Sequence, residues 1–228
     1  MKAILLQTSD PVEYAPFLAA TSRTTSEFCR RQGIEYRQFT GIKRGSFPWH
    51  STYNRITMMQ ELLEEGHRGW VIYLDADAYV VDLDFPISDY LIGNIEFAMI
   101  AARINSTAPY WNINAGVLFI NLTHAIGRQL VAELVEKLTA VTEKRQFKKN
   151  EWPYSELRLD DQGLLQTILM ENPEWEEFIK YEPQTLINSL DASFVRHHLR
   201  AMTPDLADRL RLVEAAVDQI MQRSDEAN

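Results

Sequence analysis

The chain lacks the features that build covalent cross-links or membrane anchors. Cys29 is its only cysteine, so an intrachain disulfide and a cysteine-based zinc site are both excluded. No stretch approaches the roughly 18 apolar residues of a membrane span, and residues 1–7 turn polar too soon for a signal peptide. We therefore expect a cytoplasmic protein without a membrane span.

Long runs of positive charge are also absent. Lysine and arginine number 23 against 32 acidic residues, for a net charge of −9. A nucleic-acid partner is therefore not expected, because no basic track could follow a phosphate backbone. The most basic segment, 144–149, is predicted to be a solvated loop, and a peripheral contact with a membrane surface or an anionic acceptor through it stays an alternative.

The 228 residues, 46% of them hydrophobic, are enough to bury a substantial core. We expect one domain over residues 1–228, with residues 203–228 forming a terminal amphipathic helix and a polar tail. That helix either covers the core or forms a dimer seam. The pattern does not separate these alternatives, so the oligomeric state stays open.

The hydrophobic pattern alternates between strands and helices. Strands are expected at 2–7, 34–39, 70–74, 97–102, 117–121, 178–181 and 193–198. Helices are expected at 12–31, 51–65 (capped by Ser51), 123–143, 159–170 and 204–223. Two strand–helix units precede the third strand, which predicts an α/β fold with a mainly parallel sheet. In such folds ligands bind at the carboxyl ends of the strands.

Two carboxylates follow the strongest predicted strand, 70–74. Asp75 and Asp77 are separated by one residue and enter a loop directly from that strand. Oxygen ligands of this kind suit Mg²⁺ and Mn²⁺, and an uncompensated carboxylate pair repels itself unless a cation is present. The alternative is an ordinary solvated turn, since aspartate favours turns.

Three later segments offer groups that a metal–nucleotide site needs. Asn114, Ala115 and Gly116 precede the strand at 117–121, where small residues permit close approach to the backbone and amides bond sugar hydroxyls. Asp160, Asp161 and Gln162 open a predicted helix, where aspartate also serves as an N-cap. His197 and His198 follow a short strand, although such histidines are often structural.

In this order, the segments resemble GT-A-fold, metal-dependent, retaining glycosyltransferases. The resemblance is closest to the group of galactomannan galactosyltransferases and xyloglucan xylosyltransferases. The chain is also similar to the group of glycogenin and the lipopolysaccharide galactosyltransferases. The resemblance rests on four segments: the strand with Asp75-Ala76-Asp77, the Asn114-Ala115-Gly116 strand, the Asp160-Asp161-Gln162 helix start, and His197. These motifs span roughly residues 2–200 in family order.

The resemblance implies that Asp75 and Asp77 bind Mn²⁺ or Mg²⁺, with His197 as the remaining protein ligand. His198 is the alternate ligand, because the aromatic residue and the glycine that usually follow the family histidine are missing. Contacts with the nucleotide-sugar donor are implied for one set of residues: Thr8, Ser9, Arg55, Asp75, Ala76, Asn114, Ala115 and Gly116.

The resemblance also implies the reaction, which is transfer of a hexose or pentose from a nucleotide diphosphate sugar, by default a UDP-sugar, to a glycan or other hydroxyl acceptor. Asp161 and Asn114 would hold hydroxyl groups, and Gln162 would lie near the anomeric carbon. A glutamine is a poor nucleophile, so same-face attack by the acceptor is favoured. A covalent intermediate on Asp160 or Asp161 is the alternative.

Two other functions fit parts of the pattern. A haloacid-dehalogenase-type phosphatase would use Asp75 as nucleophile and Asp77 as acid/base, but its motif normally opens the chain, and Tyr79 is unusual for it. A non-catalytic nucleotide-sugar-binding protein is the other alternative. Trp111 and Trp152 are candidates for stacking on sugar rings.

Overall fold

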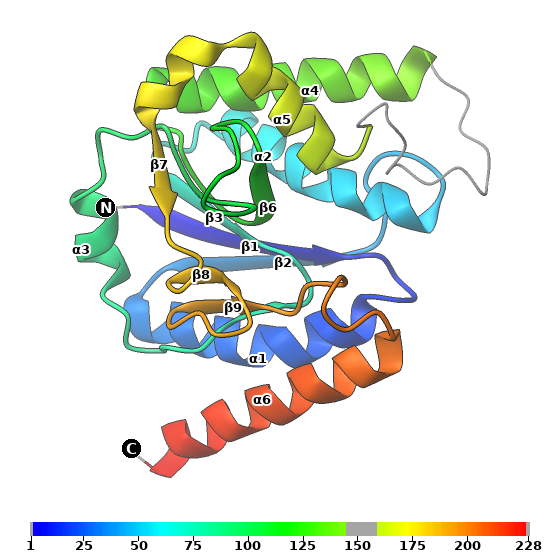
Figure 1. Ribbon diagram of the computed structural model, residues 1–228, viewed down its shortest axis with the longest axis vertical. Helices are drawn as coiled ribbons and strands as arrows, with labels where there is room; N and C mark the ends of the chain where they lie inside the picture. The colour runs from blue at the N-terminus through cyan, green and yellow to red at the C-terminus, as the bar shows by residue number, and fades with distance from the viewer. Residues whose placement is uncertain (1, 145–158, 227–228) are drawn as a thin grey trace.

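The structure, a computed structural model, describes residues 2–144 and 159–226, and its centre is a six-stranded sheet (Figure 1). The strand order is β2-β1-β3-β6-β5-β7. These strands are β1 (Ala3–Ser9), β2 (Glu35–Thr40), β3 (Trp70–Leu74), β5 (Met99–Arg103), β6 (Ile113–Asn121) and β7 (Ile179–Glu182). A smaller sheet has the order β4-β9-β8, with β4 (Ala78–Val80), β8 (Ile187–Ser189) and β9 (Val195–His197).

The large sheet is mostly parallel, as the sequence predicts, with β6 reversed. Strand β1 runs parallel to β2 and β3, and β5 runs parallel to β7. Strand β6 is antiparallel to both of its neighbours, β3 and β5. Because Leu74 at the end of β3 pairs with Val117 of β6, the first residues of β6 lie at the edge of the sheet where β3 ends.

Helices cover both faces of the sheet (Figure 1). One face carries α1 (Ala15–Gln32) and α6 (Leu206–Glu226), and the other carries α2 (Asn54–Glu64), α4 (Ala125–Lys144) and α5 (Asp161–Glu171). Alternation along each strand separates the two cores, since Leu5 packs with the first group of helices and Leu6 with the second. Shorter helical segments are α3 (Ile87–Ile92) and the 3-10 turns η1 (Pro48–Tyr53) and η2 (Pro173–Phe178).

Several predicted boundaries were wrong. Ser51 does not cap a helix, because it lies inside η1, and α2 begins only at Asn54. Around it the rings of Trp49, His50 and Tyr53 pack together, with His50 stacked on Tyr53 and Trp49 edge-on to both. This packing favours a compact turn over a regular first helical turn. The strand predicted at 117–121 begins at Ile113, so the Asn114-Ala115-Gly116 segment lies within β6.

The terminal helix α6 packs against α1 through Val213, Val217 and Ile220, so it covers the core. Within the described ranges no helix is long and apolar enough to cross a membrane. Residues 145–149 of the basic segment, and Trp152, lie outside the described residues.

Candidate metal and donor site

The turn that follows β3 is held by two buried side chains from neighbouring elements. Gln7 of β1 donates from its side-chain amide to the carbonyl oxygens of Asp75 (3.1 Å) and Ala78 (2.8 Å). Thr21 of α1 donates from its hydroxyl to the carbonyl of Ala76 (2.9 Å). Buried carbonyls need such partners, and here the partners fix the path of the turn. The turn therefore presents its two aspartate side chains at set positions.

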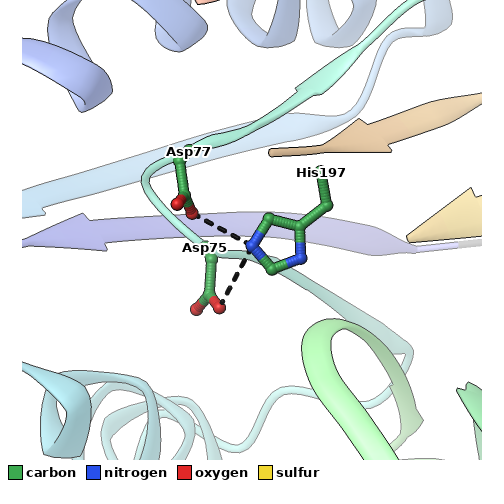
Figure 2. Close-up of side chains that lie close together, drawn as sticks. All are labelled: Asp75, Asp77 and His197. Atoms are coloured by element: carbon green, nitrogen blue, oxygen red, sulfur yellow. Dashed lines mark hydrogen bonds and ion pairs between the residues drawn. The ribbon is translucent and has the colours of Figure 1, made fainter. Parts of the chain in front are cut away.

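Strand β9 brings a histidine to these aspartates from 120 residues away in the chain. Strands β4 and β9 are antiparallel, with Ala78 opposite His197. The Nε2 atom of His197 lies 3.0 Å from Oδ1 of Asp77 and 3.8 Å from Oδ2 of Asp75. Figure 2 shows both carboxylates facing this one ring nitrogen.

His198, the alternate ligand, points elsewhere. His198 directly follows β9, and its Nε2 atom lies 3.2 Å from the hydroxyl of Tyr79. Its backbone N–H donates to the carbonyl of Asp77. His197 is therefore the imidazole that faces the two carboxylates.

Charge pairing offsets the burial of this group. Burial disfavours the charged form of Asp77, but His197 and Arg209 hold the pKa of its carboxyl below the usual value. Burial likewise disfavours protonation of His197, but the Asp77 carboxylate raises the pKa of that imidazole above its usual value. The site thus holds a buried charge pair of Asp77 and His197. A divalent cation that bound both residues would take the place of the proton between them.

The donor set fits a divalent cation. Among the described residues, Asp75, Asp77 and His197 form a group whose ligand atoms all lie within 4.8 Å of one another. Two carboxylate oxygens and an imidazole nitrogen suit a divalent ion such as Mn²⁺, and three protein ligands leave positions for substrate oxygens and water. The Asp75 side chain is 29% exposed, whereas the other two are buried, so the open side of the group lies at Asp75.

Arg55 of α2 connects Asp75, Asp77 and His197, called here the metal group, to the start of α5. Its Nη2 atom pairs with Oδ1 of Asp75 at 2.7 Å, and its Nε atom forms an ion pair with Asp161. Its Nη1 atom donates to the carbonyl of Ala115, and the guanidinium stacks over the ring of Tyr73 at 4.0 Å. Because Arg55 is buried, its contacts fix the positions of Asp75, Asp161 and the Ala115 carbonyl within the protein.

Replacing Arg55 with methionine should lower the free energy of unfolding by about 3–5 kcal/mol, because Asp161 would stay buried without its counter-ion. Arg37→Met is the matched control. Arg37 also pairs with two carboxylates, Glu35 and Glu65, but is 33% exposed, and surface pairs contribute about 0–1 kcal/mol. Urea unfolding of both variants measures the difference. Equal losses would show that the Arg55 network is not a buried ion-pair network.

The first residues of α5 are anchored to β6. Asp160 is the N-cap of the helix, and its Oδ1 accepts from the backbone N–H of Gly163 at 2.6 Å. The side-chain carbonyl of Gln162 accepts from the backbone N–H of Ala115 at 2.9 Å. Burial raises the pKa of the Asp161 carboxyl to about 7, against the opposing pull of Arg55. The capping alternative is therefore correct for Asp160. Asp161 instead contacts Arg55, and Gln162 contacts Ala115.

The space beside the Cα atom of Gly116 is filled by the imidazole of His197 and is not open to solvent or a ligand. A Cβ atom at this position would overlap the His197 ring and would lie 3.0 Å from Oδ2 of Asp75. The neighbouring Asn114 accepts from the Gly116 backbone N–H through its side-chain oxygen, at 2.9 Å. Gly116 was predicted to let a bound ligand approach the backbone. In the structure its lack of a side chain makes room for His197, the candidate metal ligand.

Thr8 and Ser9 lie at the end of β1, on the same edge of the sheet. Both are buried. The hydroxyl of Thr8 lies 3.3 Å from that of Tyr73, and the hydroxyl of Ser9 donates to that of Thr40 at 3.4 Å. The fold therefore brings both residues near the site, where their hydroxyls already have protein partners.

Arg209 is a site residue that the sequence reasoning missed. It is 1% exposed, and its Nη1 atom lies 3.7 Å from Oδ2 of Asp77. A signal was present, because Arg209 follows Leu206 by three positions and precedes Val213 by four, which places it on the apolar face of α6. A lone arginine on that face indicates a buried charge partner.

Gln7, Thr21 and Asn188 were also missed, because each stands beside other polar residues and no spacing distinguishes it from them. Asn188 lies behind the metal group, where its side-chain oxygen accepts from Nδ1 of His197 at 2.7 Å. Only the fold brings these residues to the site.

No family model and no curated protein matches this chain. Solved structures do match its fold. A glycosyltransferase involved in the glycosylation of the major capsid of PBCV-1 has a TM-score of 0.65 and 16% identity, over 94% of this chain and 100% of that one. The apo form of the glycosyltransferase GlyE from Streptococcus pneumoniae TIGR4 has a TM-score of 0.50 and 15% identity, over 98% of this chain and 64% of that one.

These likenesses, together with the mostly parallel sheet and the acidic turn after β3, show that the chain has a GT-A glycosyltransferase fold.

Proposed function

We propose that this protein is a metal-dependent glycosyltransferase that moves a hexose or pentose from a nucleotide diphosphate sugar, with UDP as the nucleotide, to a hydroxyl of a glycan or other acceptor. The observation that carries the proposal is the meeting of Asp75, Asp77 and His197 at the end of β3 in a GT-A fold. Ligands of open α/β sheets bind at this edge.

Asp75, Asp77 and His197 would hold Mn²⁺ or Mg²⁺, and the bound cation would neutralise the negative charge that collects on the leaving diphosphate. The partly exposed Asp75 marks the side from which the diphosphate would approach. Arg55 keeps the Asp75 carboxylate oriented, because it binds one of its two oxygens.

Gln162, Asp161 and Asn114 would position the sugars. The carbonyl of Gln162 is fixed by Ala115, so its amide plane is set. No described residue accepts from the amino group of that amide, which leaves it for a sugar or an acceptor oxygen. We assign Gln162 to the neighbourhood of the anomeric carbon, and Asp161 and Asn114 to the hydroxyl groups.

Retention of the anomeric configuration follows from the family resemblance, and the state of the nearby carboxylates favours one of its two routes, same-face attack, over a covalent intermediate. Asp160 caps α5, and Asp161 is buried against Arg55, so neither is free to attack the anomeric carbon. A glutamine is a poor nucleophile. The reaction that remains is same-face attack, in which the acceptor oxygen bonds to the anomeric carbon as the bond to the diphosphate breaks. The departing phosphate oxygen then takes the acceptor's proton.

A release assay against a panel of nucleotide sugars tests the proposal, with UDP-galactose, UDP-glucose and UDP-xylose as the first donors. We expect slow release of UDP from one or two donors without any acceptor, because transferases commonly hydrolyse their donors slowly. The release should require added Mn²⁺ or Mg²⁺ and should stop with EDTA. This outcome would fix the class of reaction and leave the acceptor to be found.

Two other outcomes would replace the proposal. Cleavage of a generic phosphomonoester, with no turnover of any nucleotide sugar, would favour the phosphatase, although Asp75 follows the third strand and is paired with Arg55. Calorimetric binding of UDP with Mn²⁺, without release from any donor or transfer to any acceptor, would indicate a nucleotide-sugar-binding protein.

A further inference from the structure

Asn188 stands directly behind the imidazole of His197. It lies in β8, is fully buried, and has a backbone φ of 73°. It is the one non-glycine residue in the described ranges with a positive φ. Asparagine adopts this left-handed conformation more readily than most residues, but the conformation is still unusual and marks positions that the surrounding structure determines.

The orientation of the Asn188 amide follows from its second partner. One of its side-chain atoms lies 3.2 Å from the backbone carbonyl of Asn114. A carbonyl oxygen only accepts hydrogen bonds, so the atom facing it is the amino group. The other atom, 2.7 Å from Nδ1 of His197, is therefore the carbonyl oxygen.

This orientation decides which nitrogen of His197 carries the proton. Because the Asn188 oxygen only accepts, Nδ1 of His197 must donate. The Asp77 carboxylate, 3.0 Å from Nε2, also only accepts, so Nε2 carries a proton while no cation is bound. A cation that displaces this proton would meet the lone pair of Nε2, the atom that faces Asp75 and Asp77, while Nδ1 keeps its proton. Metal-binding histidines usually donate their second N–H to such an acceptor, which fixes the ring and raises its basicity.

We propose that Asn188 is a positioning residue that holds His197 in the Nδ1–H form, with Nε2 directed at the metal site, and thereby sets the affinity of that site for a divalent cation. The inference rests on the proposed function only for the presence of the cation. The ring has little freedom otherwise, since Gly116 packs against one side of it and Asp77 bonds its far nitrogen.

The test uses Asn188→Gly and Asn188→Asp in the full chain. Glycine accepts a positive φ and removes only the side chain. It should weaken Mn²⁺ binding, measured by electron paramagnetic resonance of the free ion, by about 10- to 100-fold. Aspartate tolerates the same backbone and keeps an acceptor oxygen, so it should recover most of the affinity.

Asn94→Gly is the matched control. Asn94 is also buried and bonded through both amide atoms, to the Tyr90 carbonyl (2.6 Å) and to Lys180 (2.7 Å), but it precedes β5. It should lose stability and keep the wild-type affinity for Mn²⁺.

Equal Mn²⁺ affinity in Asn188→Gly and in the wild type would overturn the inference. So would a parallel loss of affinity in Asn94→Gly, because the effect would then follow stability alone. If the wild type bound no divalent cation, the metal site and the proposed function would fail together with the inference. Failure of the inference alone is distinct, since the wild type would then bind Mn²⁺ normally.

Discussion

Replacing Asp77 with asparagine is expected to abolish metal-dependent release of nucleotide from a donor sugar and to weaken Mn²⁺ binding by at least about 100-fold. Changes in the residues behind metal ligands already cost 10- to 100-fold, so loss of a ligand charge should exceed that range. Asparagine keeps the shape of the side chain but removes the charge that faces His197 at 3.0 Å and Arg209 at 3.7 Å. Electron paramagnetic resonance titration and the release assay measure the two losses.

Two further variants keep this prediction testable. Asp84→Asn is the control, because Asp84 lies in the same acidic stretch but is 80% exposed, and it should behave as the wild type. His197→Gln removes another ligand and leaves the Asp77–Arg209 contact in place, so it decides the matter if Asp77→Asn unfolds. Wild-type metal dependence in both Asp77→Asn and His197→Gln would place the cation elsewhere.

The main elements of the fold were predictable because their periodic patterns are long. Strand β3 was predicted at 70–74 and is found there. The helix predicted at 12–31 is α1 (Ala15–Gln32), which ends at the left-handed Gly33. The strands β4, β8 and β9 have three residues each, too few for a period-2 pattern to show. Only β9 was predicted, as part of a longer strand, although together these strands carry His197 and Asn188.

Part of the candidate site was also predictable from local sequence, and part was not. Asp75 and Asp77 are adjacent in sequence and follow a clear strand, so their pairing could be read directly from the chain. The contact with His197 depends on the pairing of β4 with β9, and the choice over His198 depends on where the chain directs the residue after β9, which is toward Tyr79. Those facts belong to tertiary structure, and only the family resemblance pointed to this histidine.

Arg55 and Gly116 show a second reason for the limits of sequence reasoning. Both were expected to contact a donor, and in the structure both contact the protein groups that form the site. A sequence motif records that a residue type is needed at a position. It does not record whether the need comes from a ligand or from the side chains that hold a ligand.

Gly116→Ala is expected to disrupt the metal site through a single methyl group. The added Cβ would overlap the imidazole of His197 and press on Asp75. The ring cannot retreat easily, because Asn188 and Asp77 hold both of its nitrogens. We expect Mn²⁺ affinity to fall by at least about 10- to 100-fold, as for other losses of ligand positioning. The strain should also lower the free energy of unfolding by about 1–3 kcal/mol.

Gly93→Ala separates this effect from the general cost of a methyl group. A Cβ at Gly93 would meet only the carbonyl oxygens of Asp89 and Tyr90, at 3.4 and 3.8 Å, and the backbone there is right-handed. That variant should keep both its stability and its Mn²⁺ affinity. If Gly116→Ala also bound Mn²⁺ as tightly as the wild type, His197 would have to move away without cost. A histidine that is free to do so is not a metal ligand, and the cation would then depend on the aspartates alone.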